Sequence, residues 1–427
     1  METKELPALQ VHENKRFLKT ADGAPFFWLG DTAWCLYKMA PAEVDQYMEN
    51  RARKKYTVVQ AMAIRTHGGM DNYHGDEPFE SLSPVKLSET YWKHIDYIVD
   101  KAAENGMYAA LATMWGHNAN TLFPNPAQDN QDYGRLLGER YKDRNNVIWL
   151  VAGEYGKIRD DWAQTKDEGL TEEHINLFRA IAHGLRDGHG GKHLMTIHPI
   201  FSSSRHFHED AWLDFNMEQT WLNFRACPGR VTEDYGKKPP KPAVNGEPGY
   251  EGMGRPDLEK ETITPWIARA QAYWCVFSGA FGHTYGSNGL WQFSRPPREP
   301  SWTDAMAREG GAHMQHVRAL MESVAFPNMA PDQELITSAN GTAREKTYIA
   351  ALRDEAGAFA FVYLPQGGTV SVDLAKLKPD ASFKVRWFDP RTGAYKEGHD
   401  RDGGAPADFE APSSGENQDW VLTLKAG

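Results

Sequence analysis

The sequence predicts an α/β protein: a (β/α)8 barrel followed by a small antiparallel β-sandwich. About eight short apolar runs alternate with amphipathic stretches over residues 16–328, as a barrel requires. The alternative, an open doubly wound sheet, is disfavoured because no Gly-rich phosphate loop follows the first run. After Pro327 and Pro331 the pattern changes to short alternating segments separated by turns. We therefore expect a (β/α)8 barrel over residues 1–330 and a sandwich over residues 331–427.

The barrel elements are predicted from apolar periodicity and from the residues that begin and end helices. Pro41 is suited to a first helical turn, and Gly106 to the end of a helix. Asp22-Gly23 predicts a hairpin turn between residues 16–20 and 25–29. The expected strands are 25–29, 57–63, 107–113, 147–151, 194–197, 215–219, 242–245 and 281–285. The expected helices are 41–55, 89–105, 133–142, 171–186, 264–278 and 311–321.

The C-terminal segments alternate apolar and polar residues, which is typical of strands with one buried face. Gly- and Pro-containing turns separate them, and roughly 95 residues are enough to form an independent core. The expected sandwich strands are 346–352, 358–364, 368–374, 382–388 and 420–424.

Composition excludes several classes of protein. The net charge is −11 and no basic stripe is present, so we expect no nucleic-acid partner. No run of 18 apolar residues occurs, so we expect no membrane partner. The three cysteines, Cys35, Cys227 and Cys275, lie far apart, which argues against a CxxC metal or redox motif, and their odd, small number argues against a disulfide framework. No cofactor is expected, and the oligomeric state stays open. Residues 1–19 lack the apolar core of a signal peptide. We therefore expect a cytoplasmic protein, or a periplasmic or secreted one if a leader has been removed.

Two acids follow apolar runs where a fourth and a seventh barrel strand should end. Glu154 comes after the run 147–153, and Glu247 comes after 242–246. Because catalytic groups of barrels lie at the C-terminal ends of the strands, these two carboxylates are candidates for glycoside hydrolysis. Glu251 competes with Glu247, because Pro248-Gly249 makes the end of the strand uncertain. The structural alternative is that either acid is an ion-pair partner at the rim.

Other polar and aromatic residues near expected strand ends are candidates for binding the sugar. Carboxylates, amides and imidazoles can bond its hydroxyls, and indole rings can stack on its apolar faces. The candidates are Asp31, Trp34, His67, Trp115, His198, Gln219, His283, Tyr285 and Trp291.

His206 and His208 suggest a different chemistry, because two imidazoles at this spacing can bind zinc. They lie in a Ser-rich loop after the fifth expected strand, whereas metal-dependent barrel hydrolases usually place such a pair after the first. We therefore expect no metal, and keep a metal-dependent hydrolase as an alternative. A barrel that binds carbohydrate without cleaving it is the other alternative.

Four segments together resemble the apiosidase-like glycoside hydrolases, the group around glycoside hydrolase family 140. They are 26–34 (FFWLGDTAW), 146–154 (NVIWLVAGE), 245–252 (NGEPGYEG) and 282–286 (GHTYG). Segment 385–393 (VRWFDPRTG) is similar to the C-terminal β-sandwich of the collagen-binding type found in that group.

The resemblance covers nearly the whole chain and implies a glycosidase that degrades a plant or algal polysaccharide. It implies an acid at position 154 and a second from the segment 245–251 as the catalytic pair, in a mechanism that we expect to retain the anomeric configuration. The family includes enzymes that cleave apiose-linked side chains of pectin, so an apiosidase-like activity is one expectation. Many relatives carry Asp where this chain has Glu154, which leaves the substrate open.

Overall fold

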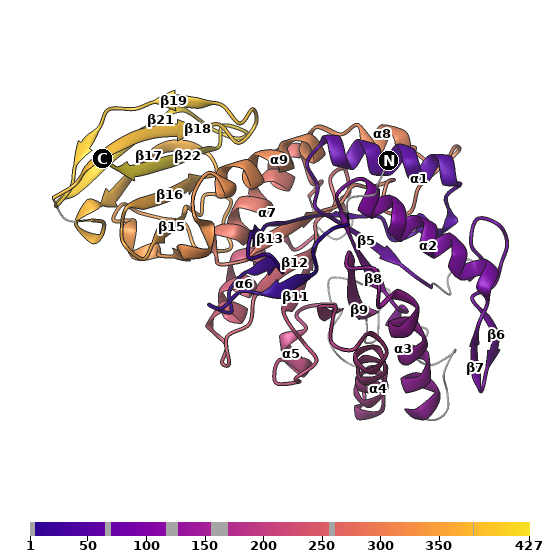
Figure 1. Cartoon of the computed structure of the whole chain (residues 1–427). Helices are drawn as coiled ribbons and strands as arrows, with labels where there is room; N and C mark the ends of the chain where they lie inside the picture. The colour runs from indigo at the N-terminus through magenta and orange to yellow at the C-terminus, as the bar shows by residue number, and fades with distance from the viewer. Residues whose placement is uncertain (1–4, 65–69, 117–126, 155–169, 256–260, 379) are drawn as a thin grey trace.

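Eight parallel strands form a closed sheet surrounded by helices, and an antiparallel domain packs beside it (Figure 1). The computed structural model describes residues 5–64, 70–116, 127–154, 170–255, 261–378 and 380–427. This architecture confirms the predicted fold class. No helix in these ranges has both the length and the apolarity that crossing a membrane requires.

The barrel strands pair in parallel in the order β10-β9-β8-β5-β4-β13-β12-β11. Between the two ends of this path, Thr196 Oγ1 donates to the Phe215 carbonyl at 2.7 Å, and Asp214 N donates to the Met195 carbonyl at 2.9 Å. These bonds bring the first and last strands of the path together. The strands are β4 (Trp28–Thr32), β5 (Val58–Met62), β8 (Tyr108–Ala112), β9 (Val147–Gly153), β10 (Met195–His198), β11 (Asn216–Trp221), β12 (Ala243–Pro248) and β13 (Gly282–Tyr285).

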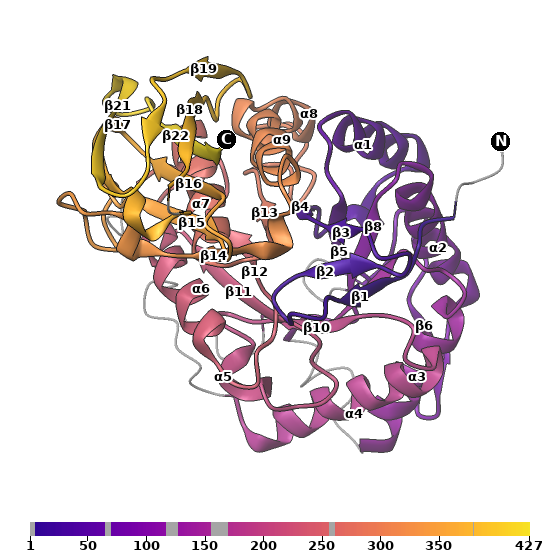
Figure 2. The ribbon, with the colours of Figure 1, turned by 60° about the vertical axis from the view of Figure 1, so that its left-hand side comes forward.

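Helices follow the strands and form the outer layer of the barrel (Figure 2). The helix after β9 shows how the sequence sets its ends. The Thr171 side chain accepts from His174 N at its start, and Gly190 adopts φ 62° after its last residue. The helices are α1 (Pro41–Arg53), α2 (Glu89–Glu104), α3 (Ala127–Tyr141), α4 (Glu172–His189), α5 (Ser204–Phe207), α6 (Cys227–Gly236), α7 (Pro265–Phe277), α8 (Trp302–Met306) and α9 (Glu309–Glu322).

A three-stranded antiparallel sheet lies at the end of the barrel where the strands begin. It consists of β1 (Leu9–Val11), β2 (Leu18–Thr20) and β3 (Pro25–Phe26). Phe26 packs edge-on against Tyr108, the first residue of β8, with ring centroids 5.1 Å apart. This end of the barrel is therefore covered, and the opposite end carries the polar side chains described below. A short hairpin, β6 (Phe79–Leu82) and β7 (Val85–Leu87), lies outside the barrel.

The C-terminal domain contains two antiparallel sheets. Its apolar core includes Val362, Val370, Phe383 and Leu422, which come from strands of both sheets. The larger sheet contains β14 (Met329–Pro331), β15 (Ala350–Asp354), β16 (Phe359–Leu364), β22 (Trp420–Ala426), β18 (Ser382–Phe388), β19 (Tyr395–Glu397) and β20 (Arg401–Asp402). The smaller sheet pairs β17 (Gly367–Asp373) with β21 (Pro406–Ser414).

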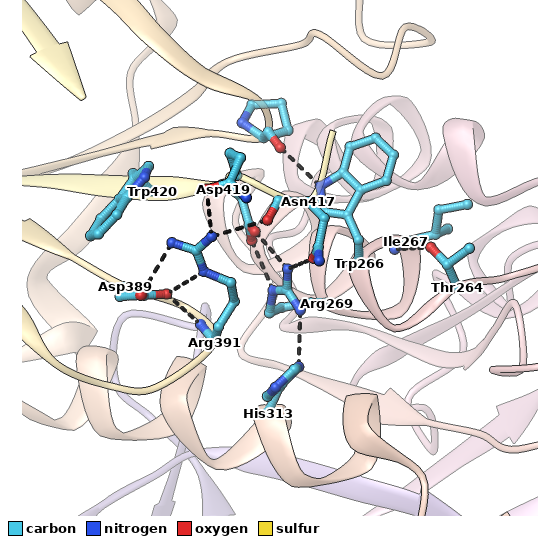
Figure 3. Close-up of polar contacts among 12 residues, drawn as sticks. Thr264, Trp266, Ile267, Arg269, His313, Asp389, Arg391, Asn417, Asp419 and Trp420 are labelled. Carbon is cyan, nitrogen blue, oxygen red and sulfur yellow. Dashed lines mark hydrogen bonds and ion pairs between the residues drawn. The ribbon is translucent and has the colours of Figure 1, made fainter. Parts of the chain in front are cut away.

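The sandwich packs against α7 and α9 of the barrel (Figures 1 and 2). The rings of Tyr273 and Tyr363 stack across this interface with centroids 4.8 Å apart. Arg269 forms a bidentate ion pair with Asp419, at 2.6 and 2.9 Å (Figure 3). Both of these charged residues are buried. The apolar core of the barrel also continues into the second domain, where it includes Phe361 and Val421.

Two expectations from the sequence are wrong. Cys227 of α6 and Cys275 of α7 form a disulfide, although the odd, small number of cysteines argued against a disulfide framework. The number of cysteines does not show that two helices 48 residues apart in the sequence will lie side by side. Asp31 was expected to follow the first barrel strand, but it lies inside β4. The strand begins later than predicted, at Trp28, and continues to Thr32.

Candidate active site

Glu154 directly follows β9, at the end of the barrel opposite the covering sheet. Its backbone N–H donates to the carbonyl of His198 at 2.9 Å, which ties it to the end of β10. Trp115 Nε1 donates to Glu154 Oε2 at 3.0 Å. The Glu154 side chain is therefore held at the mouth of the barrel, with 8% of the residue exposed.

Glu247 lies near the end of β12, and three side chains bond its carboxylate. His198 Nε2 lies 2.6 Å from Glu247 Oε2, and Gln219 Nε2 donates to the same oxygen at 3.0 Å. The Tyr250 hydroxyl donates to Glu247 Oε1. Burial, followed by the charge of Glu247, raises the pKa of Tyr250 well above its usual value, so this hydroxyl stays a donor. With partners on both oxygens, the carboxylate has one preferred orientation.

Gln219 joins the two acids. Its Nε2 donates to Glu154 Oε1 at 2.9 Å as well as to Glu247 Oε2 at 3.0 Å. By the sum of these distances, the two carboxylate oxygens are at most about 6 Å apart. The register places Gln219 of β11 directly beside Glu247 of β12, so the pairing of the strands produces this bridge.

Aromatic rings surround the pair of acids. The rings of Trp34 and Trp115 meet edge-on with centroids 5.0 Å apart, and His198 lies 5.0 Å from Trp34 and 5.6 Å from Trp115. Trp34 Nε1 donates to the Tyr250 hydroxyl at 2.9 Å. Trp291 is partly exposed, with its ring centroid 6.3 Å from that of Tyr250. The two carboxylates are therefore packed among aromatic rings, of which Trp34 and Trp115 are buried and Trp291 is partly exposed.

Two residues of the site have a strained backbone. Glu154 has φ +41° and Trp221, at the end of β11, has φ +43°. Non-glycine residues in this region cost about 1–3 kcal/mol and are concentrated at functional sites. Trp221 pairs with Pro248, the residue after Glu247, so both strained positions lie at this end of the barrel.

Glu251 is in a different environment from Glu247. Its carboxylate accepts from the Tyr285 hydroxyl and from Gly310 N, at 3.3 Å, in the first turn of α9. Only 2% of the residue is exposed. Glu251 and Tyr285 therefore connect β13 to α9, and within the described part of the chain their hydrogen bonds do not include Glu154 or Glu247.

Two other candidates are buried in the protein interior. Asp31 is fully buried, and its carboxylate accepts from Arg51 Nε at 2.7 Å and from the Tyr47 hydroxyl at 2.5 Å. His283 is 1% exposed, and burial lowers its pKa to about 3, so its imidazole is neutral. The structure thus brings together Glu154, Glu247, Trp34, Trp115, His198 and Gln219, with Trp291 beside Tyr250. His67 lies outside the described residues.

The histidines of the alternative metal site have other neighbours. His208 Nε2 lies 2.9 Å from the Pro239 carbonyl, and His208 Nδ1 lies 3.3 Å from Asn216 Oδ1. Across the described part of the chain, no three His, Cys, Asp or Glu side chains are grouped as metal ligands would be. The alternative of a metal-dependent hydrolase therefore has no ligand set among these residues.

Tyr250 and Asn245 were not among the predicted site residues. Tyr250 bonds Glu247 directly, and the Asn245 side chain accepts from Glu247 N at 3.1 Å. Both lie within the segment 245–252 that carries the family resemblance. Tyr250 lies three residues after Glu247 and Asn245 two residues before it, and this closeness in the sequence could have indicated both contacts.

Gly153 provides a test of how Glu154 is oriented. A Cβ at this position would lie 2.1 Å from the Trp115 ring, so the indole that bonds Glu154 would have to move. We expect Gly153→Ala to lower kcat by about 10²-fold, the cost of roughly 1 Å of misplacement. The measurement is steady-state kinetics beside Gly229→Ala, where a Cβ meets no atom within 4 Å. Unchanged kcat in Gly153→Ala would show that the Trp115 contact does not matter.

The chain matches two known protein families. Residues 12–328 match the family described as "Apiosidase-like, catalytic domain", and residues 330–425 match "Putative collagen-binding domain of a collagenase". A comparison with curated proteins finds no match.

Two solved structures are similar over nearly the whole chain, and a third is similar over part of it. A structure described as "Glycoside hydrolase" is 28% identical, with a TM-score of 0.86, and the match covers 98% of this chain and 97% of that one. A glycoside hydrolase family 5 protein from Bacteroides vulgatus is 27% identical, with a TM-score of 0.85 and coverage of 99% and 93%. An endo-1,4-β-mannanase from Rhizomucor miehei shares the fold, at 13% identity and a TM-score of 0.53, with coverage of 74% and 100%.

Proposed function

The chain belongs to the apiosidase-like family of glycoside hydrolases, and on this basis we propose that it cleaves a glycosidic bond with retention of configuration. Glu154 is the general acid and base, and Glu247 is the nucleophile. The observation that carries this proposal is the Gln219 bridge, which holds both carboxylates at one mouth of the barrel.

The reaction has two steps. In the first, a Glu247 oxygen attacks the anomeric carbon while Glu154 protonates the departing oxygen, which leaves a glycosyl ester on Glu247. In the second, Glu154 takes a proton from water, which attacks the same carbon and releases the sugar. Glu247 suits the nucleophile because His198, Gln219 and Tyr250 orient its carboxylate. The carboxyl group of Glu154 accepts hydrogen bonds from two uncharged side chains, those of Trp115 and Gln219.

The distance between the acids supports retention. Retaining glycosidases place their carboxyl groups about 5–5.5 Å apart, whereas inverting enzymes need about 6.5–9.5 Å to admit a water molecule. The limit of about 6 Å between the bridged oxygens of Glu154 and Glu247 favours the shorter range.

The proposed substrate is a fragment of a plant or algal polysaccharide. The more specific proposal within this class is an apiose-linked side chain of pectin. The aromatic rings of Trp34, Trp115 and Trp291 support a sugar as the bound group. Family membership supports the polysaccharide class, although one fold can serve several sugars.

A screen of plant cell-wall oligosaccharides followed by proton NMR tests this proposal. We expect the first-formed sugar to carry the same anomeric configuration as the bond that was cut. An inverted first product would remove the nucleophile role of Glu247. Cleavage that survives in both Glu154→Gln and Glu247→Gln would refute the pair.

A further inference from the structure

The backbone around Glu247 is fixed by side chains from several elements. Asn245 Oδ1 accepts from Glu247 N at 3.1 Å, and Gln60 Nε2 of β5 donates to the Gly246 carbonyl at 2.7 Å. Gln271 of α7 bonds both backbone groups of Gly249, accepting from N at 2.7 Å and donating to O at 3.2 Å. The proposed nucleophile therefore lies in a segment whose backbone is held on both sides.

Asn245 connects this segment to the disulfide. Its Nδ2 donates to Thr220 Oγ1 at 2.9 Å and lies 3.7 Å from Cys227 Sγ and 3.6 Å from Cys275 Sγ. Asn245 and both cysteines are fully buried. The amide thus lies between the Glu247 N–H on one side and the two sulfurs on the other.

We propose that Asn245 is a positioning residue for Glu247 and that the Cys227–Cys275 disulfide fixes the orientation of its amide. Neither bonded sulfur carries a proton, so both act only as weak acceptors and face the NH₂ group of Asn245. The amide oxygen is then directed at Glu247 N. Two free thiols could donate as well as accept, and the Asn245 amide would lose this preference. This inference rests on the proposed role of Glu247.

The helix α7 explains how the disulfide and Gln271 act on the same segment. Gln271 and Cys275 are four residues apart and share one face of the helix, toward β12. Arg269 and Tyr273 contact the sandwich instead. Because the sulfurs are buried, this disulfide is a fixed support that solvent does not reach in the folded state.

Steady-state kinetics of the full chain test the proposal on the oligosaccharide that the wild type cleaves fastest. We expect Asn245→Ala to lower kcat by about 10- to 100-fold, the range for a misplaced catalytic group, with little change in KM. We expect the double variant Cys227→Ala/Cys275→Ala to lower kcat about tenfold. Val231→Ala is the matched control, because Val231 packs in the same buried cluster as the two cysteines. It should lower the melting temperature and leave kcat nearly unchanged. A loss of kcat in Val231→Ala as large as in the other two variants overturns the proposal.

Crystal structures of the same variants provide a readout that needs no substrate. In Asn245→Ala and in the double cysteine variant, we expect Glu247 to lose its 2.6 Å contact with His198. A Glu247 that keeps its contacts with His198, Gln219 and Tyr250 in both variants overturns the proposal. If the wild type cleaves no glycoside, the proposed function fails, while these structures still decide whether Asn245 positions Glu247.

Discussion

Replacing Glu247 with alanine is expected to lower kcat by about 10⁵-fold, because the covalent intermediate can no longer form. Sodium azide should restore part of the rate, since the small anion can enter the space left between His198, Gln219 and Tyr250. The rescued product should be a glycosyl azide of inverted configuration, formed in a single displacement. Product analysis by NMR measures both the rate and the configuration.

Glu251→Gln is the control for this experiment. The glutamine oxygen can accept from Gly310 N, and its NH₂ group can donate to the Tyr285 hydroxyl oxygen. This residue lies outside the group of residues bonded to Glu154 and Glu247. We expect its kcat to stay within about tenfold of the wild type, well above that of a variant without its nucleophile. A loss in Glu251→Gln as large as in Glu247→Ala would assign the nucleophile to the wrong acid.

Asp419→Ala is expected to have the largest effect on stability. The substitution leaves the buried Arg269 guanidinium without its carboxylate at the contact between barrel and sandwich (Figure 3). Removing one partner of a buried ion pair typically costs about 3–5 kcal/mol. Asn417 and His313 also bond Arg269, but neither carries a compensating negative charge. Urea unfolding followed by tryptophan fluorescence measures the loss.

Two variants serve as comparisons for Asp419→Ala. Asp419→Asn keeps the shape of the side chain and one acceptor, so its loss should be smaller. Lys376→Ala removes an ion pair with the exposed Glu334 and should leave the unfolding midpoint nearly unchanged. If Asp419→Ala unfolds at the same urea concentration as Lys376→Ala, the ion pair does not hold the domains together.

The ends of the barrel strands could be predicted from the sequence because two signals agreed there. The apolar run before Glu154 must be a buried strand, and an acid directly after such a run is placed at the mouth of the barrel. The same reasoning applies to Glu247, although the strand continues one residue beyond it, to Pro248. The apolar periodicity therefore predicted that both acids lie at the same end of the barrel.

The sequence did not predict contacts that depend on the direction of a side chain or on how distant segments pack together. Asp31 follows apolar residues as Glu154 does, but it faces Arg51 of α1, and a pattern of apolar residues does not show which way a side chain points. Cys227 and Cys275 meet only because α6 and α7 lie side by side. Gln219 was selected as a sugar ligand, whereas its bridge between two acids depends on the register of β11 and β12.

The most direct test of the account is to trap the glycosyl-enzyme intermediate. A 2-deoxy-2-fluoro glycosyl fluoride of the preferred sugar should slow the second step and leave the label on the enzyme. Mass spectrometry of the digested protein should then find one added sugar on the Glu247 side chain, with Glu154 and Glu251 unmodified. A label on either of those residues, or turnover without any covalent adduct, would contradict the roles given to the two acids.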